Sequence, residues 1–525
     1  MQLFATTPLA RPIDVLPGLR ATIAHASPAL KNDRPSVPVV DDRTLDIFRR
    51  AKNPEDALEL RDLWLGRVEH ELGIHSSRPW QAEQWRASRP RRDVAAQEVL
   101  SSRSTVRFVK ELFNWYFRED LYGDLREDAE LILSGGSVDE LRWGLPEALK
   151  DTIRYALDRD WYGYSDSCGR IPAREAVAAY ENARSAGAAY TAENIALTMG
   201  GTFAVSSLAD FVFTGRPVDG AAPVLCGIPN YPPLVEAIAR RTTVELVPLA
   251  DHGGTMSVDA LIAALTPATP MVLLQTAANP TGAAVGEEDL ERLITAAFPT
   301  TLIVLDECHE WLGTPRAVSR LRANSNVVRI SSLSKNWSAP GIKAGWIVAD
   351  KSFIADYYEY ASTSFGGPPS FLYTAIEMLA RMERWMLTGV TRVGSAELNE
   401  FESSYGLRLD SLQAAYDSYR AERHDRESAL VTLRDASVAE LSVLGRTTRP
   451  EYSINTMVRF DQWDDSYRCF RDLLRTSGVS VYPGILNFWF DGGVARFTTA
   501  RPWEELEPAF ARIGVALGNR EVLHA

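Results

Sequence analysis

The sequence predicts a mixed α/β protein: a mostly parallel central sheet flanked by helices, followed by a smaller α+β domain at the C-terminal end. From about residue 130, short apolar runs alternate with helical stretches, which is the pattern of parallel strands joined by helical crossovers. The chain has 525 residues, of which 46% are hydrophobic and 24% charged, as is typical of folded globular proteins. Its length predicts two or more structural units with a large core.

The region before residue 125 differs from the rest. Six prolines within residues 1–40 predict an extended arm instead of a helix. Apolar residues at helical spacing predict helices from Asp41 to about Gly73 and from about Arg103 to Arg118, with a polar, arginine-rich linker around Arg86 to Arg92. This N-terminal extension could wrap a dimer, cover an active-site entrance or bind a bulky substrate, or it could be a structural and oligomeric extension.

Six short apolar runs predict the strands of the central sheet. They are Ile195–Thr198, Pro223–Cys226, Val244–Val247, Met271–Leu274, Leu302–Leu305 and Val327–Ile330. From about Ala355 the pattern is helical, and further strands are predicted at Met457–Phe460, Val479–Tyr482 and Val494–Phe497. The predicted division is therefore an N-terminal arm and helical extension (1–125), a large α/β domain (126–350) and a small C-terminal domain (351–525).

Composition and charge exclude several classes of function. A net charge of -13 opposes binding to nucleic acids or anionic membranes, and residues 1–125 are nearly neutral, with 19 basic and 18 acidic side chains. No apolar stretch approaches the roughly 18 residues of a membrane span. We therefore expect a cytoplasmic location, and the negative charge favours a small-molecule substrate. The four cysteines are scattered without metal-binding spacing, so we expect free thiols and no metal.

Two short motifs predict reactive or ligand-binding groups. Lys335, one of only seven lysines, comes just after the apolar run Val327–Ile330, where its amine could attack a carbonyl. Gly200, Gly201 and Thr202 stand between a predicted strand and a predicted helix, an arrangement that presents backbone N–H groups to a phosphate.

These motifs belong to a recognisable series. Ser332-x-x-Lys335, with the basic Lys343 eight residues later, resembles the cofactor-lysine motif of fold-type I pyridoxal phosphate (PLP) enzymes, the class I/II aminotransferase family. Two further motifs of the family also match in the expected order. They are the turn Asn279-Pro-Thr-Gly and Asp306, which stands at the end of a predicted strand. The resemblance covers roughly residues 130–515. It implies aminotransferase fold type I, with residues 126–350 as the PLP-binding domain, and a homodimer with shared active sites.

The resemblance also implies a role for each matching residue. Lys335 would form the Schiff base and move the substrate's α-proton, Asp306 would keep the pyridine nitrogen protonated, and Asn279 would bind the cofactor's 3-oxygen. Gly200, Gly201, Thr202, Ser332 and Lys343 would bind the phosphate, Tyr231 would stack on the ring, Tyr164 would reach the neighbouring subunit's phosphate, and Arg496 would bind the substrate α-carboxylate, with Arg501 as a second candidate.

Two positions depart from the family pattern. Lys343 replaces the commoner arginine and offers a point charge to the phosphate. His309 stands where a tyrosine usually binds the cofactor oxygen; a histidine can donate the same hydrogen bond but can also move protons. This is either a conservative replacement or a sign of other chemistry.

The resemblance predicts an enzyme that acts on an amino acid through an external aldimine, first of all an aminotransferase. The alternative is a specialised PLP lyase, transferase or cyclase of natural-product biosynthesis, catalysing elimination, replacement or annulation, with S-adenosylmethionine among the possible substrates. A PLP-responsive transcription regulator is a remote alternative, because the N-terminal region has no helix-turn-helix pattern and no net basic charge.

Overall fold

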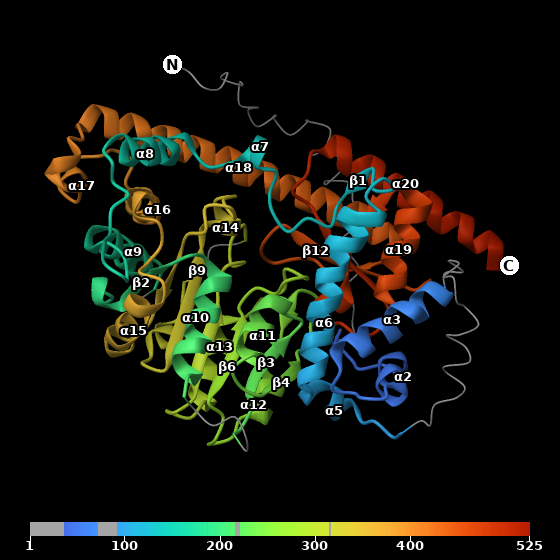
Figure 1. Ribbon diagram of the computed structural model, residues 1–525. Coiled ribbons are helices and arrows are strands. Elements are labelled where there is room, and N and C mark those ends of the chain that lie inside the picture. Colours follow the sequence, from blue (N-terminus) through green and yellow to red (C-terminus); the bar gives the residue numbers. More distant parts are fainter. Residues whose placement is uncertain (1–35, 72–91, 186, 216–220, 314–316, 525) are drawn as a thin grey trace. The chain divides into compact units, whose positions relative to one another are not determined.

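The computed structural model describes residues 36–71, 92–185, 187–215, 221–313 and 317–524 (Figure 1). The predicted arm lies almost entirely outside the described residues, as does most of the arginine-rich linker. The described residues form two compact units. Unit 1 is drawn from Ser137–Ala204 and Thr314–Leu433, and unit 2 from Ile23–Gly136, Val205–Gly313 and Arg434–Ala525. The three-part division inferred from the sequence stays a prediction.

Unit 1 is mainly helical around a short sheet. Its elements are α7 (Glu140–Trp143), α8 (Glu147–Asp158), α9 (Ile171–Arg184), η2 (Ala192–Asn194), β2 (Ile195–Thr198), η3 (Arg320–Ala323), β9 (Val327–Ser332), α14 (Leu333–Asn336), β10 (Gly345–Val348), α15 (Lys351–Ser364), η4 (Ser370–Leu372), α16 (Tyr373–Leu387), α17 (Ser395–Leu398) and η5 (Ser403–Tyr405). Two helices contain the unit boundaries, α10 (Gly201–Phe213) and α18 (Leu409–Leu444).

The sheet of unit 1 has the strand order β2-β10-β9, with β10 antiparallel to both neighbours. The short apolar run of β10 was not among the predicted strands. One side of the sheet packs in a core with α9 and α16 that includes the buried Trp346 and Trp385. Within this core, the carboxylate of Glu181 accepts hydrogen bonds from Trp346 Nε1 at 3.0 Å and from Arg329 at 2.8 Å. The buried Arg329 is therefore paired, as a buried charge requires.

Unit 2 contains the parallel strands and the C-terminal sheet. Its N-terminal and central elements are α2 (Asp42–Arg50), α3 (Ala57–Glu71), α5 (Ala96–Ser101), α6 (Arg103–Trp115), the π-helix η1 (Tyr116–Asp124), β1 (Leu131–Ile132), β3 (Val224–Ile228), α11 (Pro232–Ala239), β4 (Val244–Pro248), β5 (Thr255–Met256), α12 (Asp259–Ala264), β6 (Met271–Gln275), β7 (Ala284–Val285), α13 (Glu287–Ala296) and β8 (Leu302–Asp306). Its C-terminal elements are β11 (Arg446–Thr447), β12 (Asn455–Phe460), α19 (Ser466–Ser477), β13 (Val479–Ser480), β14 (Tyr482–Pro483), η6 (Gly484–Asn487), β15 (Gly493–Thr498) and α20 (Trp503–His524).

The strands β8-β6-β3-β4 of unit 2 are parallel in this order. Nearly every residue in them is buried, as expected for strands covered on both faces. This arrangement confirms the predicted α/β class and the predicted strands from Pro223 to Leu305. Since β6 and β8 run in the same direction, their C-terminal ends meet at one edge, where Gln275 lies opposite Asp306.

The C-terminal sheet has the order β11-β12-β15-β14. The single strand predicted at Val479–Tyr482 is wrong in detail, because the chain changes sheets within it. Val479 and Ser480 pair in parallel with β1, whereas Tyr482 and Pro483 pair antiparallel with β15. The register places Tyr482 directly opposite Arg496.

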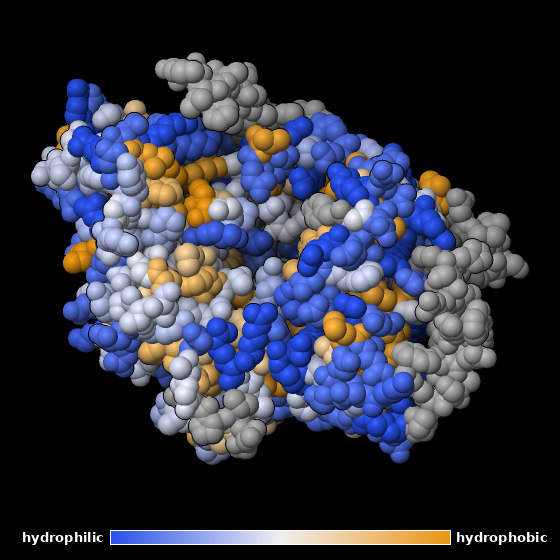
Figure 2. Space-filling view, in the orientation of Figure 1, coloured by the Kyte–Doolittle hydropathy of each residue, from blue (hydrophilic) through white to orange (hydrophobic). Residues whose placement is uncertain are grey.

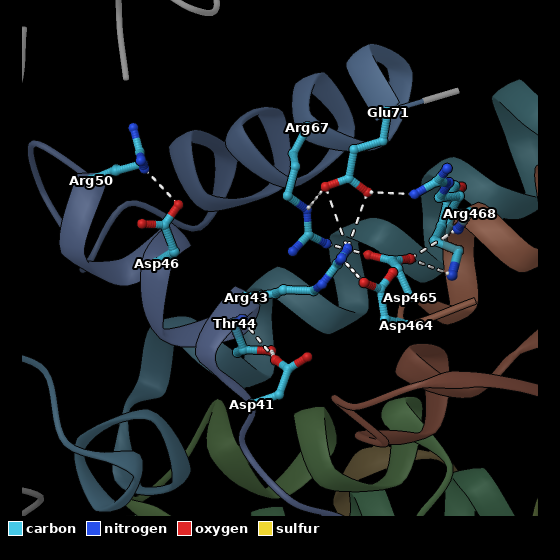
Figure 3. A network of polar contacts seen from close by, with 11 residues as sticks. Asp41, Arg43, Thr44, Asp46, Arg50, Arg67, Glu71, Asp464, Asp465 and Arg468 are labelled. Atoms are coloured by element: carbon cyan, nitrogen blue, oxygen red, sulfur yellow. Dashed lines mark hydrogen bonds and ion pairs between the residues drawn. The ribbon is translucent and has the colours of Figure 1, made fainter. Parts of the chain in front are cut away.

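The N-terminal helices are an integral part of unit 2. Helix α6 packs against α3 and α11 and lies between them in Figure 1. Figure 3 shows a polar network that ties α2 and α3 to the segment entering α19. In it, Arg67 of α3 pairs with the buried Asp465, and Glu71 accepts from Arg43 at 3.1 Å. Asp465 also caps α19, since its Oδ1 accepts from the N–H groups of Tyr467 and Arg468.

The surface agrees with the acidic, polar composition. Hydrophilic side chains cover most of the face shown in Figure 2, and the apolar ones form small separate patches. In the described part of the chain, we find no helix with both the length and the apolar character needed to span a membrane.

Candidate active site

Unit 1 brings the predicted phosphate-binding residues together at one end of its sheet. Gly200 follows β2 with a positive φ of 84°, and α10 begins at the next residue. A Cβ atom on Gly345 would lie 2.5 Å from the carbonyl oxygen of Ser331 and 3.2 Å from the Cα atoms of Gly200 and Ser332. The backbones of these segments therefore meet so closely that only glycine fits at 345.

The donors at this end of the sheet suit a phosphate group. A Cβ on Gly200 would lie 3.9 Å from the Cα of Lys343, so the lysine is part of the same cluster. Ser332 is buried, Gly201 half-buried, and Thr202 and Lys343 exposed. A helix N-terminus, a hydroxyl and an ammonium group together fit an anion.

Lys335 lies in α14, in the turn that follows β9. The next two residues are held by side chains of α18: Trp337 Nε1 donates to Tyr419 Oη at 2.9 Å, and Arg423 donates to Asn336 Oδ1 at 3.2 Å. Arg423 also pairs with the buried Glu383 of α16 at 2.9 Å. The half-buried lysine thus sits on a firmly anchored turn, as a positioned nucleophile requires.

Asp306 is the last residue of β8 and is buried in unit 2. Its Oδ2 accepts from Gln275 Nε2 at 2.9 Å, and its Oδ1 accepts from the backbone N–H of Cys308 at 3.1 Å. Gln275 also accepts from the backbone N–H of Asn279 at 3.3 Å, which links the two predicted cofactor residues. A fixed, buried carboxylate of this kind can hold a proton on a ring nitrogen.

Arg496, on β15, lies beside Asn279 and is 4% exposed. Its guanidinium donates to Asn279 Oδ1 at 2.9 Å and to the Ser134 carbonyl at 2.7 Å, and it lies 4.0 Å from the centre of the Tyr482 ring. Burial lowers the pKa of Arg496. Among the described residues, no carboxylate pairs with it, and its buried Nε has no partner. A buried, uncompensated guanidinium fits a carboxylate ligand.

Tyr231 and His309 lie in the same unit. The Tyr231 ring is half-buried, and burial raises the pKa of its hydroxyl. His309 is buried, and its Nδ1 shares a hydrogen bond of 2.9 Å with Ser453 Oγ. Ser453 adopts a positive φ of 66°, so the segment that supplies it is held in an uncommon conformation.

The surroundings of the two remaining predicted residues, Tyr164 and Arg501, differ from each other. Tyr164 is fully exposed in unit 1, so its predicted reach toward a neighbouring subunit stays a prediction. Arg501 is half-buried near Gly135: a Cβ there would lie 3.3 Å from its guanidinium.

The sequence interpretation missed three residues that contact the predicted ones: Gln275, Ser453 and Tyr482. Gln275 had a usable signal, because it follows the predicted strand Met271–Leu274 directly. Ser453 and Tyr482 had none, since their positions depend on pairing between distant segments.

Comparison with known proteins identifies the family. The family model "Aminotransferase class I and II" matches residues 132–441, more than half of the chain. The chain therefore belongs to the class I and II aminotransferase family. This confirms the resemblance and the fold type I architecture inferred from the sequence.

Individual relatives are more distant. An aromatic amino acid aminotransferase of Mycolicibacterium vanbaalenii is 33% identical over 31% of this chain and 48% of its own length. Aromatic-amino-acid aminotransferase 2 of Thermococcus litoralis is 24% identical over 76% of this chain and 95% of its own. The chain thus spans about half the length of the first of these curated relatives.

The solved structures establish the fold. The aspartate aminotransferase of Thermus thermophilus, determined with maleate, superposes with a TM-score of 0.59 at 22% identity, covering 81% of this chain and 100% of that one.

Proposed function

We propose that this chain is a PLP-dependent aminotransferase that acts on an amino acid. The observation that carries the proposal is the buried guanidinium of Arg496 beside Asn279, which lacks a carboxylate partner among the described residues. An amino-acid α-carboxylate would supply that charge through paired hydrogen bonds. Every relative named above is an aminotransferase, which favours transamination over the specialised reactions and over a regulator.

Each unit contains side chains whose chemistry suits part of the cofactor. We assign both groups of residues to the same cofactor because of the family to which the chain belongs. The Gly200–Thr202 segment, Ser332 and Lys343 would hold the phosphate. Asn279, His309 and Tyr231 would hold the ring and its oxygen. When bound, pyridoxal phosphate supplies an electron-accepting ring that stabilises negative charge at the substrate's α-carbon.

The chain's own groups would divide the remaining work. Asp306 would keep a proton on the ring nitrogen, with Gln275 fixing the carboxylate. Arg496 would orient the α-carboxylate, and Lys335 Nζ would hold the cofactor covalently and then carry the α-proton. A homodimer, with Tyr164 reaching the partner's phosphate, and a cytoplasmic location complete the proposal.

Substitution of Lys335 tests the assignment. Lys335→Ala is expected to abolish the visible absorbance of lysine-bound cofactor and to lower turnover at least about 100-fold, because both depend on its amine. The matched control is Lys351→Ala, at an exposed lysine that begins α15. If Lys335→Ala kept both the absorbance and the turnover of the parent protein, the site assignment would be wrong.

A further inference from the structure

The end of α6 and the π-helix that follows it place aromatic rings beside two residues of the candidate site. The ring of Phe113 lies 5.8 Å from the ring of Tyr231, and the ring of Phe117 lies 6.2 Å from that of Tyr482. The two phenyl rings are 4.9 Å apart. All these separations fall in the range of aromatic contacts. π-Helices are rare and frequently occur at functional sites.

Phe113 and Phe117, the phenyl pair, connect the ring of Tyr231 with the ring of Tyr482. These four rings form a row. Tyr482 lies at the end of the row, with the Arg496 guanidinium 4.0 Å from the centre of its ring. The row therefore connects the residue proposed to stack on the cofactor with the residue proposed to bind the substrate's carboxylate.

Burial differs along the row. Tyr482 is fully buried, as is Tyr116, which backs the row and donates from its hydroxyl to the Val481 carbonyl at 2.9 Å. Phe113, Phe117 and Tyr231 are only half-buried, so each keeps ring surface that a ligand can cover. The buried members fix the position of the half-buried ones.

A basic side chain lies beside the phenyl pair. Lys110 lies 4.8 Å from the centre of the Phe113 ring and donates to Asn114, and burial lowers the pKa of its ammonium group. A second carboxylate on a substrate would meet Lys110, which already lies near Glu111 and Glu236, beside two apolar rings, whereas an apolar side chain would cover both rings.

We propose that Phe113 and Phe117 bind the side chain of the substrate and select amino acids with an aromatic or large aliphatic side chain. The inference rests on the proposed function, which assigns Tyr231 and Arg496 to cofactor and carboxylate. Both phenylalanines precede residue 132, where the family match begins, so selectivity would come from this chain's own N-terminal region.

The test compares amino donors. We would measure kcat/KM of the PLP-loaded protein for phenylalanine, leucine, alanine and aspartate, and repeat it with Phe113→Ala, Phe117→Ala and the milder Phe117→Leu. The parent protein should prefer phenylalanine or leucine. Each alanine variant should lower the ratio of phenylalanine to alanine kcat/KM at least about tenfold, with a smaller loss in Phe117→Leu.

Trp115→Ala is the matched control. It removes a half-buried aromatic ring from the same turn, but that ring packs against the guanidinium of Arg61 at 5.2 Å. Its donor ratio should equal that of the parent protein. The inference would be overturned if the ratio stayed unchanged in both alanine variants, or if the parent protein preferred aspartate. A parent protein without bound cofactor or any turnover would instead overturn the proposed function itself.

Discussion

At the scale of single residues, one buried carboxyl group makes the stability of unit 2 depend on pH. Asp251 is 5% exposed; burial raises its pKa to about 6, although the Gly254 N–H and the nearby His252 oppose this shift. Among the described residues, its Oδ2 has no hydrogen-bond partner. Since the folded pKa exceeds the unfolded value of about 3.9, the folded state binds more protons between these values. Stability from this group is fully present below pH 4 and is lost as pH rises through 6.

Asp251→Asn should remove that dependence. Between pH 4 and pH 7, the parent protein should lose up to about 3 kcal/mol of unfolding free energy relative to the variant. Urea unfolding of both proteins at the two pH values measures the difference, and Asp425→Asn, at an exposed site, controls for the change in net charge. An equal gap between parent and variant at both pH values would contradict a raised pKa.

The site residues predicted from the sequence are those with a local signal. Asn279 stands in a distinctive turn, Asp306 ends a strand, and Lys335 lies in the turn that follows a strand. The residues that contact the predicted ones were harder to find. Ser453 contacts His309 from 144 positions further along the chain, and Tyr482 lies opposite Arg496 only because their strands pair. Sequence patterns report neighbours along the chain, whereas these contacts depend on how distant strands pair.

At the scale of elements, most strands of the central sheet were predictable, and β10 shows why one was not. Its four residues, Gly345–Val348, follow the lysine motif closely and run antiparallel between β2 and β9. A pattern of alternating strands and helices favours parallel crossovers, so it gives no signal for an antiparallel strand of this length. The position of β10 matters because it closes the end of the sheet where Gly200 and Ser332 meet.

Gly345→Ala should therefore weaken both the sheet and the cofactor site. Its methyl group would lie 2.5 Å from the Ser331 carbonyl oxygen, so the backbone would have to move. We expect a loss of about 1 to 3 kcal/mol in unfolding free energy and weaker binding of PLP. Denaturant unfolding and cofactor titration measure the two effects. Gly341→Ala would place its methyl more than 4 Å from every described residue other than its chain neighbours, so it should change stability by less than about 0.5 kcal/mol. Equal effects at both glycines would refute the packing argument.

At the scale of the whole molecule, the described N-terminal helices pack within unit 2. The sequence predicted the helical stretches that contain α2, α3 and α6, but it missed α5 and the π-helical form of η1. It also left open whether the region wraps a dimer, covers an entrance, binds substrate or is a structural extension. In the structure, α6 packs within unit 2, and its end contacts Tyr231. Periodicity predicts that a helix has an apolar face, but it does not tell which distant segment packs against that face.

The fate of the cofactor tests the central claim most directly. The PLP-loaded protein would be mixed with single amino acids, desalted, and its bound vitamer and products identified by mass spectrometry. Transamination predicts pyridoxamine phosphate together with the matching keto acid, most strongly with an aromatic or large aliphatic donor. Regenerated pyridoxal phosphate with a shortened, cyclised or coupled product would contradict it.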